Sequence, residues 1–249
     1  MTNWLKTAPK WVILASTLAL GACSSQPDDP YADPRDPFED TNRAVWDFNR
    51  ELDKAVIKPA AEVYENVPEP VRNSLYRALE NLQEPWSFVN NVLQGQFKDA
   101  GVTAGRFFFN STIGLLGLLD PATEMGLTKR EESLGQTLAV WGVPNGPFLM
   151  LPVLGPTVVI DRGTDWVDGN YFPYTEISDD WDIPRYTIKG LSLRLRLREQ
   201  EQVLDNSLDP YTFVKEAYYQ NWNYEVYDGN PPPEVEADAE EVDFSESSY

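Results

Sequence analysis

The stretch that decides the fold is Arg106-Phe-Phe-Phe-Asn-Ser-Thr-Ile-Gly-Leu-Leu-Gly-Leu-Leu119, closed by Asp120-Pro121. It carries no charge from Phe107 to Leu119 and is dense in large apolar side chains. A helix needs about 20 apolar residues to span a bilayer, so this stretch is too short to cross one. A buried core helix and a segment that enters the membrane interface are both compatible with its length. Gly114 and Gly117 would leave one helical face bare, which lets another helix or a lipid chain approach.

The rest of the chain is acidic and large enough to bury a core. It has 249 residues, of which 42% are hydrophobic, and a formal net charge of −20. The segment Pro231–Tyr249 carries acidic residues and no basic one. An acidic chain repels nucleic acid and is not drawn to anionic lipid headgroups. Contact with a membrane would therefore rest on apolar surface or on a covalent anchor.

Composition argues against an enzyme. Histidine is absent and Cys23 is the only cysteine, so Ser-His and Cys-His catalysis are excluded. The sequence contains no G-x-S-x-G elbow, no P-loop and no G-x-G-x-x-G motif. Carboxylates are abundant, but they fall mostly in capping, linker or tail positions. We expect no catalytic residue, no cofactor and no metal site.

The N-terminus has the pattern of a lipoprotein signal. Lysines precede the short apolar run Trp11–Leu20, and small residues follow it. Leu20-Gly21-Ala22-Cys23 resembles the bacterial lipobox, in which the cysteine is diacylated and becomes the new N-terminus. We predict a signal peptide over 1–22 and a lipid anchor at Cys23. A plain secretory signal with an incidental cysteine is the alternative.

The segments on either side of the fold are predicted from their composition. Residues 23–35 are rich in Pro and Asp and predict an acylated flexible tether. Ser24 stands where an Asp would resemble an inner-membrane retention signal, so the outer membrane is the expected destination. Residues 229–249 predict a disordered acidic tail. One helical domain is expected over 36–228.

Apolar spacing and prolines outline the first helices. Apolar residues recur at three and four from Val45 to Val56, and Pro59 is expected to limit this helix. A second helix is expected after Pro68, interrupted at Pro85 and resumed as far as Gly95. We interpret the apolar residues of these helices as ordinary core stripes.

Two later segments are harder to assign. Leu191–Arg198 alternates like a strand, but its flanks are typical of a helix, so we predict a helix with apolar residues on two opposite faces. A final helix is expected over 212–227. Gly and Pro are crowded into Gly142–Pro156, within a long uncharged region, which excludes a regular helix or a central strand. Two interpretations of that region remain: a buried loop, or an apolar, partly hydrated wall suited to an amphipathic ligand.

A series of different short motifs, each occurring once, extends from residue 36 to about residue 225. They are Asp36-Pro-Phe-Glu39 with Asn42-Arg43, Pro68-x-Pro-x-Arg72-Asn73, Asn81-Leu82-x-Glu84-Pro85, Asn90, Leu93-Gln-Gly95, Arg106-Phe-Phe-x-Asn110-Ser-Thr-x-Gly114, Gly117-x-x-Asp120, Gly135-x-Thr-Leu138, Gly142-Val, Gly146-Pro147, Leu151-Pro152-x-x-Gly155, Asp161 and Asp209-Pro-Tyr211. Each block alone is weak, whereas the ordered set resembles the MlaA/VacJ family of outer-membrane lipoproteins.

The resemblance implies a mainly α, ring-like, membrane-embedded single domain with a central amphipathic channel. Such a protein would associate with an outer-membrane porin trimer. It would remove mislocalised glycerophospholipids from the outer leaflet and pass the phospholipid to a periplasmic lipid carrier, MlaC. This retrograde transport maintains lipid asymmetry and needs no cofactor. A non-transporting structural adaptor that docks a porin is the alternative, and a phospholipase is a third, minor one.

The apolar segments and the family resemblance together suggest which residues form the lipid path. We predict that the wall or rim of the path is formed by Phe107, Phe108, Asn110, Gly114, Gly117, Trp141, Gly142 and Pro147. Asn42 and Arg43 are predicted to set the posture of the first helix.

Overall fold

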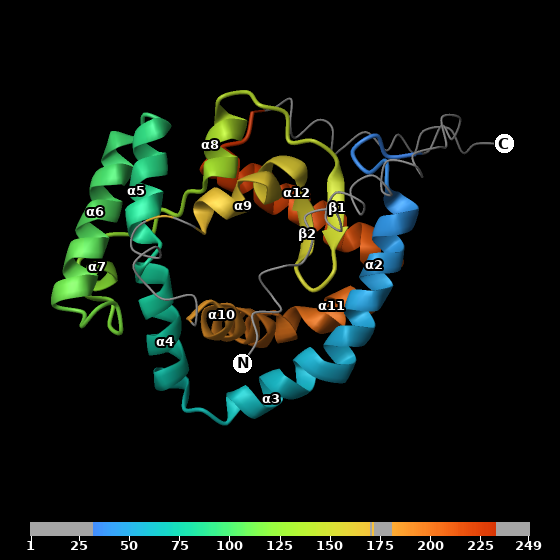
Figure 1. Ribbon diagram of the computed structural model, residues 1–249, viewed down its shortest axis with the longest axis horizontal. Helices are drawn as coiled ribbons and strands as arrows, with labels where there is room; N and C mark the ends of the chain where they lie inside the picture. The colour runs from blue at the N-terminus through green and yellow to red at the C-terminus, as the bar shows by residue number, and fades with distance from the viewer. Residues whose placement is uncertain (1–31, 170, 172–180, 233–249) are drawn as a thin grey trace, which may run out of the picture.

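The first helices form one long curved rod along an edge of the molecule (Figure 1). The computed structural model describes residues 32–169, 171 and 181–232. Helix α2 (Glu39–Leu52) runs through a π-helical turn, Asp53–Ile57, into α3 (Lys58–Glu65). The prediction that Pro59 limits the first helix is wrong. Proline lacks an N–H and crowds the carbonyl four residues back, and the wider π turn just before it accommodates both defects.

The chain then turns upward through a stack of helices on the opposite side (Figure 1). These are α4 (Glu69–Asn81), α5 (Glu84–Leu93), α6 (Phe97–Thr112) and the short α7 (Pro121–Glu124). Pro85 is the second residue of α5, where its missing N–H costs nothing, so the predicted interruption is confirmed. Helices α5 and α6 pack against each other along their length.

This helical stack has its polar residues inside and its apolar residues outside. The buried side chains of α4, α5 and α6 include Asn81, Glu84, Ser87, Asn90, Asn91, Thr103, Arg106 and Asn110. The exposed ones include Val71, Leu75, Phe88, Val89, Val92, Leu93, Phe97 and Phe108. The interpretation of these helices as ordinary core stripes is therefore wrong. Apolar periodicity shows that a helix has two faces but does not show which one points inward.

The conventional core lies elsewhere, around a small hairpin. Strand β1 (Phe148–Leu151) pairs antiparallel with β2 (Gly155–Val158), with Phe148 opposite Val158. Phe148 and Val158 are fully buried and cluster with Tyr211 and Trp222. Each strand of a two-stranded sheet is an edge strand, which tolerates the prolines of this segment. Of the two interpretations of this region, neither included a hairpin, and its strands contribute Phe148, Met150 and Val158 to the core.

The remaining helices close the fold. Helix α8 (Leu134–Val140) precedes the hairpin, and α9 (Val159–Asp168) follows it. Helix α10 (Asp182–Leu197) lies inside the curve made by α3 and α4 and contacts both (Figure 1). A 3₁₀ turn, Arg198–Gln200, leads into α11 (Glu201–Asp205) and then α12 (Pro210–Val226). The predicted helical state of Leu191–Arg198 and the predicted final helix are confirmed, as is a mainly helical single domain.

The described part of the chain begins with residues bound to α12. Arg35 pairs with Glu216 at 2.6 Å and Lys215 pairs with Asp33 at 3.1 Å, so these two residues of the predicted tether contact the domain. The predicted signal peptide, Cys23, most of the predicted tether and the predicted tail beyond residue 232 lie outside the described residues. Within the described ranges, no helix is long and apolar enough to cross a membrane.

Candidate functional site

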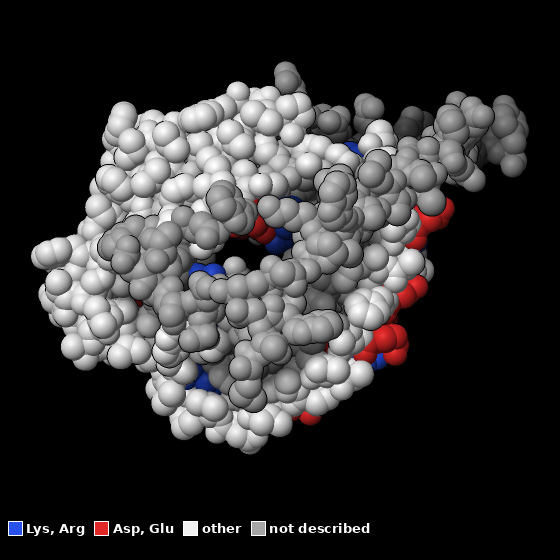
Figure 2. Space-filling model, viewed as in Figure 1, with Lys and Arg blue, Asp and Glu red and all other residues white. Residues whose placement is uncertain are grey.

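Two adjoining cavities lie between the helices. On the face shown in Figure 2 the molecule has an opening at which Lys or Arg and Asp or Glu side chains are visible. The first, here called the α10-side cavity, measures about 550 Å³ and lies between α9, α10 and the hairpin turn at Leu154. The second, here called the α12-side cavity, measures about 430 Å³ and lies between α5, α8 and α12. Gln83 and Asp168 line both cavities, so the two meet there.

The α10-side cavity has charged walls. Helix α10 contributes Arg185 and Lys189, and α9 contributes Arg162, Asp165 and Asp168. Arg162 forms an ion pair with Asp165. Burial raises the pKa of the carboxyls of Asp165 and Asp168, and burial lowers the pKa of Lys189 to about 8. These shifts indicate that the charges of this cavity are partly withdrawn from water.

The α12-side cavity is richer in carboxylates. Glu132 accepts a hydrogen bond from Gln94 Nε2 at 2.7 Å, and Gln136 Nε2 donates to Glu225 at 3.1 Å. Burial raises the pKa of Glu132 to about 7. No group of three or more His, Cys, Asp or Glu side chains in the described ranges is arranged to hold a metal ion.

An aromatic pair stands where the cavities meet. Trp86 Nε1 donates to Asp168, whose carboxylate also accepts from the backbone N–H of Leu134 at 3.0 Å. The Tyr171 ring stacks on Trp86 with centroids 5.0 Å apart. Both donors hold the Asp168 carboxylate in one position, so α5, α8 and α9 are joined at this junction.

The residues predicted for the lipid path lie away from these cavities. None of the eight lines either one: Phe107, Phe108, Asn110, Gly114, Gly117, Trp141, Gly142 and Pro147. Phe108 is 60% exposed and Trp141 is 56% exposed. Their assignment to the lipid path stays a prediction.

Several of them build the turn that follows α6. Asn110 donates to Asp120 at 2.9 Å and accepts from the backbone N–H of Ala122 at 3.1 Å. Gly117 has φ +89°, and a Cβ there would lie 2.5 Å from Asn81 Cβ. The close approach expected at Gly117 therefore occurs, between the turn and the end of α4. Helix α6 ends at Thr112, so the two glycines lie beyond it.

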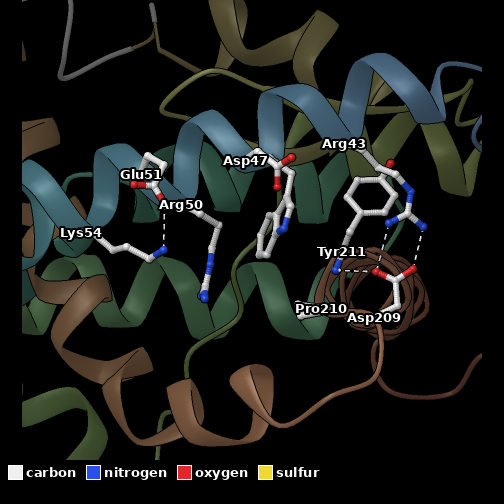
Figure 3. A pocket seen from close by; sticks show the side chains of 9 residues that line it. Arg43, Asp47, Arg50, Glu51, Lys54, Asp209, Pro210 and Tyr211 are labelled. Atoms are coloured by element: carbon white, nitrogen blue, oxygen red, sulfur yellow. Dashed lines mark hydrogen bonds and ion pairs between the residues drawn. The ribbon is translucent and has the colours of Figure 1, made fainter.

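Asn42 and Arg43 tie α2 to two distant elements. Asn42 Nδ2 donates to the carbonyl of Phe148 at 3.1 Å, and Asn42 Oδ1 accepts from the N–H of Met150 at 2.9 Å. Arg43 pairs with Asp209 at 2.6 Å, at the start of α12. Figure 3 shows the Arg43 side chain alongside the Tyr211 ring, 4.4 Å from its centroid. These contacts join α2 to the hairpin and to the start of α12, and the role of Asn42 and Arg43 in the posture of the first helix stays a prediction.

The sequence held a signal for the cavity residues that its interpretation missed. Asp165 and Asp168 are three residues apart and Arg185 and Lys189 are four apart, which is helical spacing in both cases. Charges at such spacing beside apolar residues indicate one polar helical face. That pattern does not show that the faces of α9 and α10 meet.

Comparison with known proteins assigns the chain to a family. The family model described as MlaA lipoprotein matches residues 34–225. The chain belongs to the MlaA lipoprotein family. It is 33% identical to the intermembrane phospholipid transport system lipoprotein MlaA of Escherichia coli K12, over 92% of each chain. The protein of the same description from Haemophilus influenzae is 32% identical, over 90% of this chain and 93% of that one.

A solved structure also resembles this one. It comes from work described as "Structural basis for maintenance of bacterial outer membrane lipid asymmetry". The TM-score is 0.73 at 34% sequence identity, and the match covers 77% of this chain and 98% of that chain. At this identity the likeness extends the family assignment from sequence to fold.

Proposed function

We propose that this chain is a phospholipid transport lipoprotein that maintains outer-membrane lipid asymmetry. It removes glycerophospholipids misplaced in the outer leaflet and passes them to a periplasmic lipid carrier. The observation that carries the proposal is a pair of cavities with charged linings between helices that expose large apolar side chains. The relatives from Escherichia coli and Haemophilus influenzae are named as lipoproteins of an intermembrane phospholipid transport system, which supports the proposal.

The chemistry of the ligand fits the two kinds of surface. A phospholipid has a charged headgroup and two acyl chains, so its path needs polar groups beside an apolar wall. The α10-side cavity offers Arg162, Arg185 and Lys189 next to Leu154 and Tyr186. Moving a lipid breaks no bond and needs no nucleophile, in agreement with a non-enzymatic transport family.

The outer surface supports a seat in the membrane. Soluble proteins rarely expose large contiguous apolar patches, and such patches mark membrane or protein contacts. The turn after α6 exposes Ile113, Leu115 and Leu116, the last of them 75% exposed. In this proposal the helices form a ring in the inner leaflet of the outer membrane, anchored by acylated Cys23 and facing the periplasm. The central opening is its amphipathic channel, and a porin trimer covers part of the outer wall.

Deletion of the gene tests the function. Phospholipid in the outer leaflet should rise, and cells should become sensitive to detergent combined with chelator. Wild-type protein supplied from a plasmid should reverse both effects. Unchanged outer-leaflet phospholipid in a clean deletion would refute the proposal.

The exposed apolar side chains would equally suit a structural adaptor that only docks a porin. The two functions differ in whether lipid is bound. The full chain with Cys23→Ala is purified in mild detergent and its bound phospholipid is extracted and measured. Bound phospholipid supports transport, whereas a lipid-free, freely soluble protein supports the adaptor.

A further inference from the structure

Lys189 is an unpartnered cation inside the α10-side cavity. It lines the cavity wall, and within the described ranges it makes no hydrogen bond and no ion pair. The other partly or fully buried lysines differ. Lys129 pairs with Glu80 and Glu131, and Lys215 pairs with Asp33 and Asp36. A lysine withdrawn from water normally has such a partner, because an unpaired buried charge is costly.

The acidic groups near Lys189 are already engaged. Glu80 and Glu131 attract Lys189 electrostatically, but they bind Lys129 at 2.7 Å and 2.5 Å. Lys129 and Arg185 are cations that repel it. On the facing wall, Asp165 is paired with Arg162, and the Asp168 carboxylate accepts from Trp86 and Leu134. Nothing on these walls neutralises Lys189, so an anion that enters the cavity is its remaining partner.

We propose that Lys189 binds the phosphate of a phospholipid headgroup within the α10-side cavity. The inference rests on the proposed transport function and adds a binding residue to it. A phosphodiester carries one negative charge and oxygen acceptors, which an ammonium group binds through charge-assisted hydrogen bonds. The cavity of about 550 Å³ is within the range of ligand sites. Arg185 lines the same wall and adds positive potential.

The test measures binding by the full-length acylated protein in detergent micelles, using isothermal titration calorimetry. The probes are dihexanoyl phosphatidylethanolamine, dihexanoylglycerol, which lacks the phosphate, and inorganic phosphate. Lys189→Met removes the charge and Lys189→Arg keeps it. The matched control is Lys98→Met, because Lys98 is exposed on α6 and lines neither cavity. Circular dichroism checks that each variant is folded.

The expected result separates the headgroup from the acyl chains. Lys189→Met should bind phosphatidylethanolamine about tenfold more weakly, the loss expected for one charge-assisted hydrogen bond. Lys189→Arg and Lys98→Met should bind it as the wild type does, and dihexanoylglycerol should bind all four proteins equally. Wild-type affinity for the phospholipid should fall as the pH rises through about 8, where Lys189 loses its proton. The affinity of Lys189→Arg should persist at alkaline pH.

Other outcomes would overturn the inference in distinguishable ways. If Lys189→Met and the wild type bind phospholipid with equal affinity, the role of Lys189 is refuted and the proposed transport function is not. A loss confined to inorganic phosphate assigns Lys189 to a free anion instead of a lipid headgroup. A wild-type protein that binds neither lipid overturns the inference together with the proposed function.

Discussion

Replacing Arg106 by leucine should strongly destabilise the helical stack. The Arg106 side chain is 5% exposed and pairs at 2.7 Å with Glu84, which is 4% exposed. It also donates to the carbonyl of Leu127 at 2.6 Å and to Thr123 Oγ1 at 3.0 Å. These bonds join α5, α6 and the segment after α7. Arg106→Leu removes all of them and leaves the Glu84 carboxylate buried without a counter-charge.

The magnitude follows from that stranded charge. Removing one member of a buried ion pair costs about 3–5 kcal/mol, whereas replacing both members by apolar residues can be nearly neutral. The double variant Glu84→Leu/Arg106→Leu should therefore recover most of the loss. Burial already raises the pKa of Glu84 to about 7 against the opposing effect of Arg106. Without Arg106 this carboxyl takes up a proton more readily, so the loss should be smaller at pH 5.5 than at pH 8.

Urea unfolding in detergent micelles, followed by tryptophan fluorescence at both pH values, measures these differences. Arg77→Leu is the matched control, because Arg77 is exposed on α4. A loss below about 1 kcal/mol for Arg106→Leu, or a double variant as unstable as the single one, would refute the reasoning.

Three further predictions concern single positions. Gly117→Ala should lower the free energy of unfolding in urea by about 2–4 kcal/mol, because a Cβ at positive φ would collide with Asn81. Gly101→Ala on α6 is the control and should not destabilise the protein, since the space around Gly101 is open. Equal effects of the two substitutions would contradict the prediction. Glu132→Gln should stabilise the protein by on the order of 2 kcal/mol at pH 8.5 and have little effect at pH 4. The pKa of Glu132 in the folded protein is about 7, above its ordinary value of 4.5, so the buried carboxyl lowers stability as the pH rises from about 4.5 to about 7. An effect of Glu132→Gln that does not depend on pH would contradict this prediction. Leu116→Ser should change unfolding stability by no more than about 0.5 kcal/mol. The same variant should weaken liposome partitioning of the unacylated protein about tenfold, and unchanged partitioning would speak against insertion of this turn.

Much of the helical layout could be predicted from local signals. Pro85 separates α4 from α5, and Asp209 accepts hydrogen bonds from the N–H groups of Tyr211 and Thr212 at the start of α12. The helical state of Leu191–Arg198 followed from its flanks and not from its alternation. These signals act within a few residues, through backbone geometry and capping, so the sequence contains them directly.

The orientation of the helices could not be predicted in this way. Asn90 and Asn91 are fully buried on α5, while Val89 and Val92 point outward. Apolar residues recur along a helix at the same spacing whether their face meets a protein core or a lipid bilayer. Asn90 is satisfied partly from another segment, because Thr137 Oγ1 donates to Asn90 Oδ1 at 2.9 Å. Asn91 Nδ2 donates instead within its own helix, to the carbonyl of Ser87 at 2.8 Å.

The cavity residues were missed for a related reason. The predicted lipid path followed apolar composition to α6 and to residues 141–147, whereas the cavity walls come from charged residues of α9 and α10. Lys189 and Asp168 line the same cavity only because α10 lies inside the curve of α3 and α4 (Figure 1).

The sequence by itself determined several helix boundaries, such as those at Pro85 and Asp209, and the exclusion of histidine-based catalysis. It also contains the lipobox-like motif and the motifs that resemble a family. The tertiary structure alone decided which helical faces are buried and which charges share a cavity. Helix formation depends on interactions within one or two turns, which the order of residues specifies. Burial and charge pairing depend on segments far apart in the chain, as in the contact between Arg43 and Asp209 or between Arg106 and Glu84.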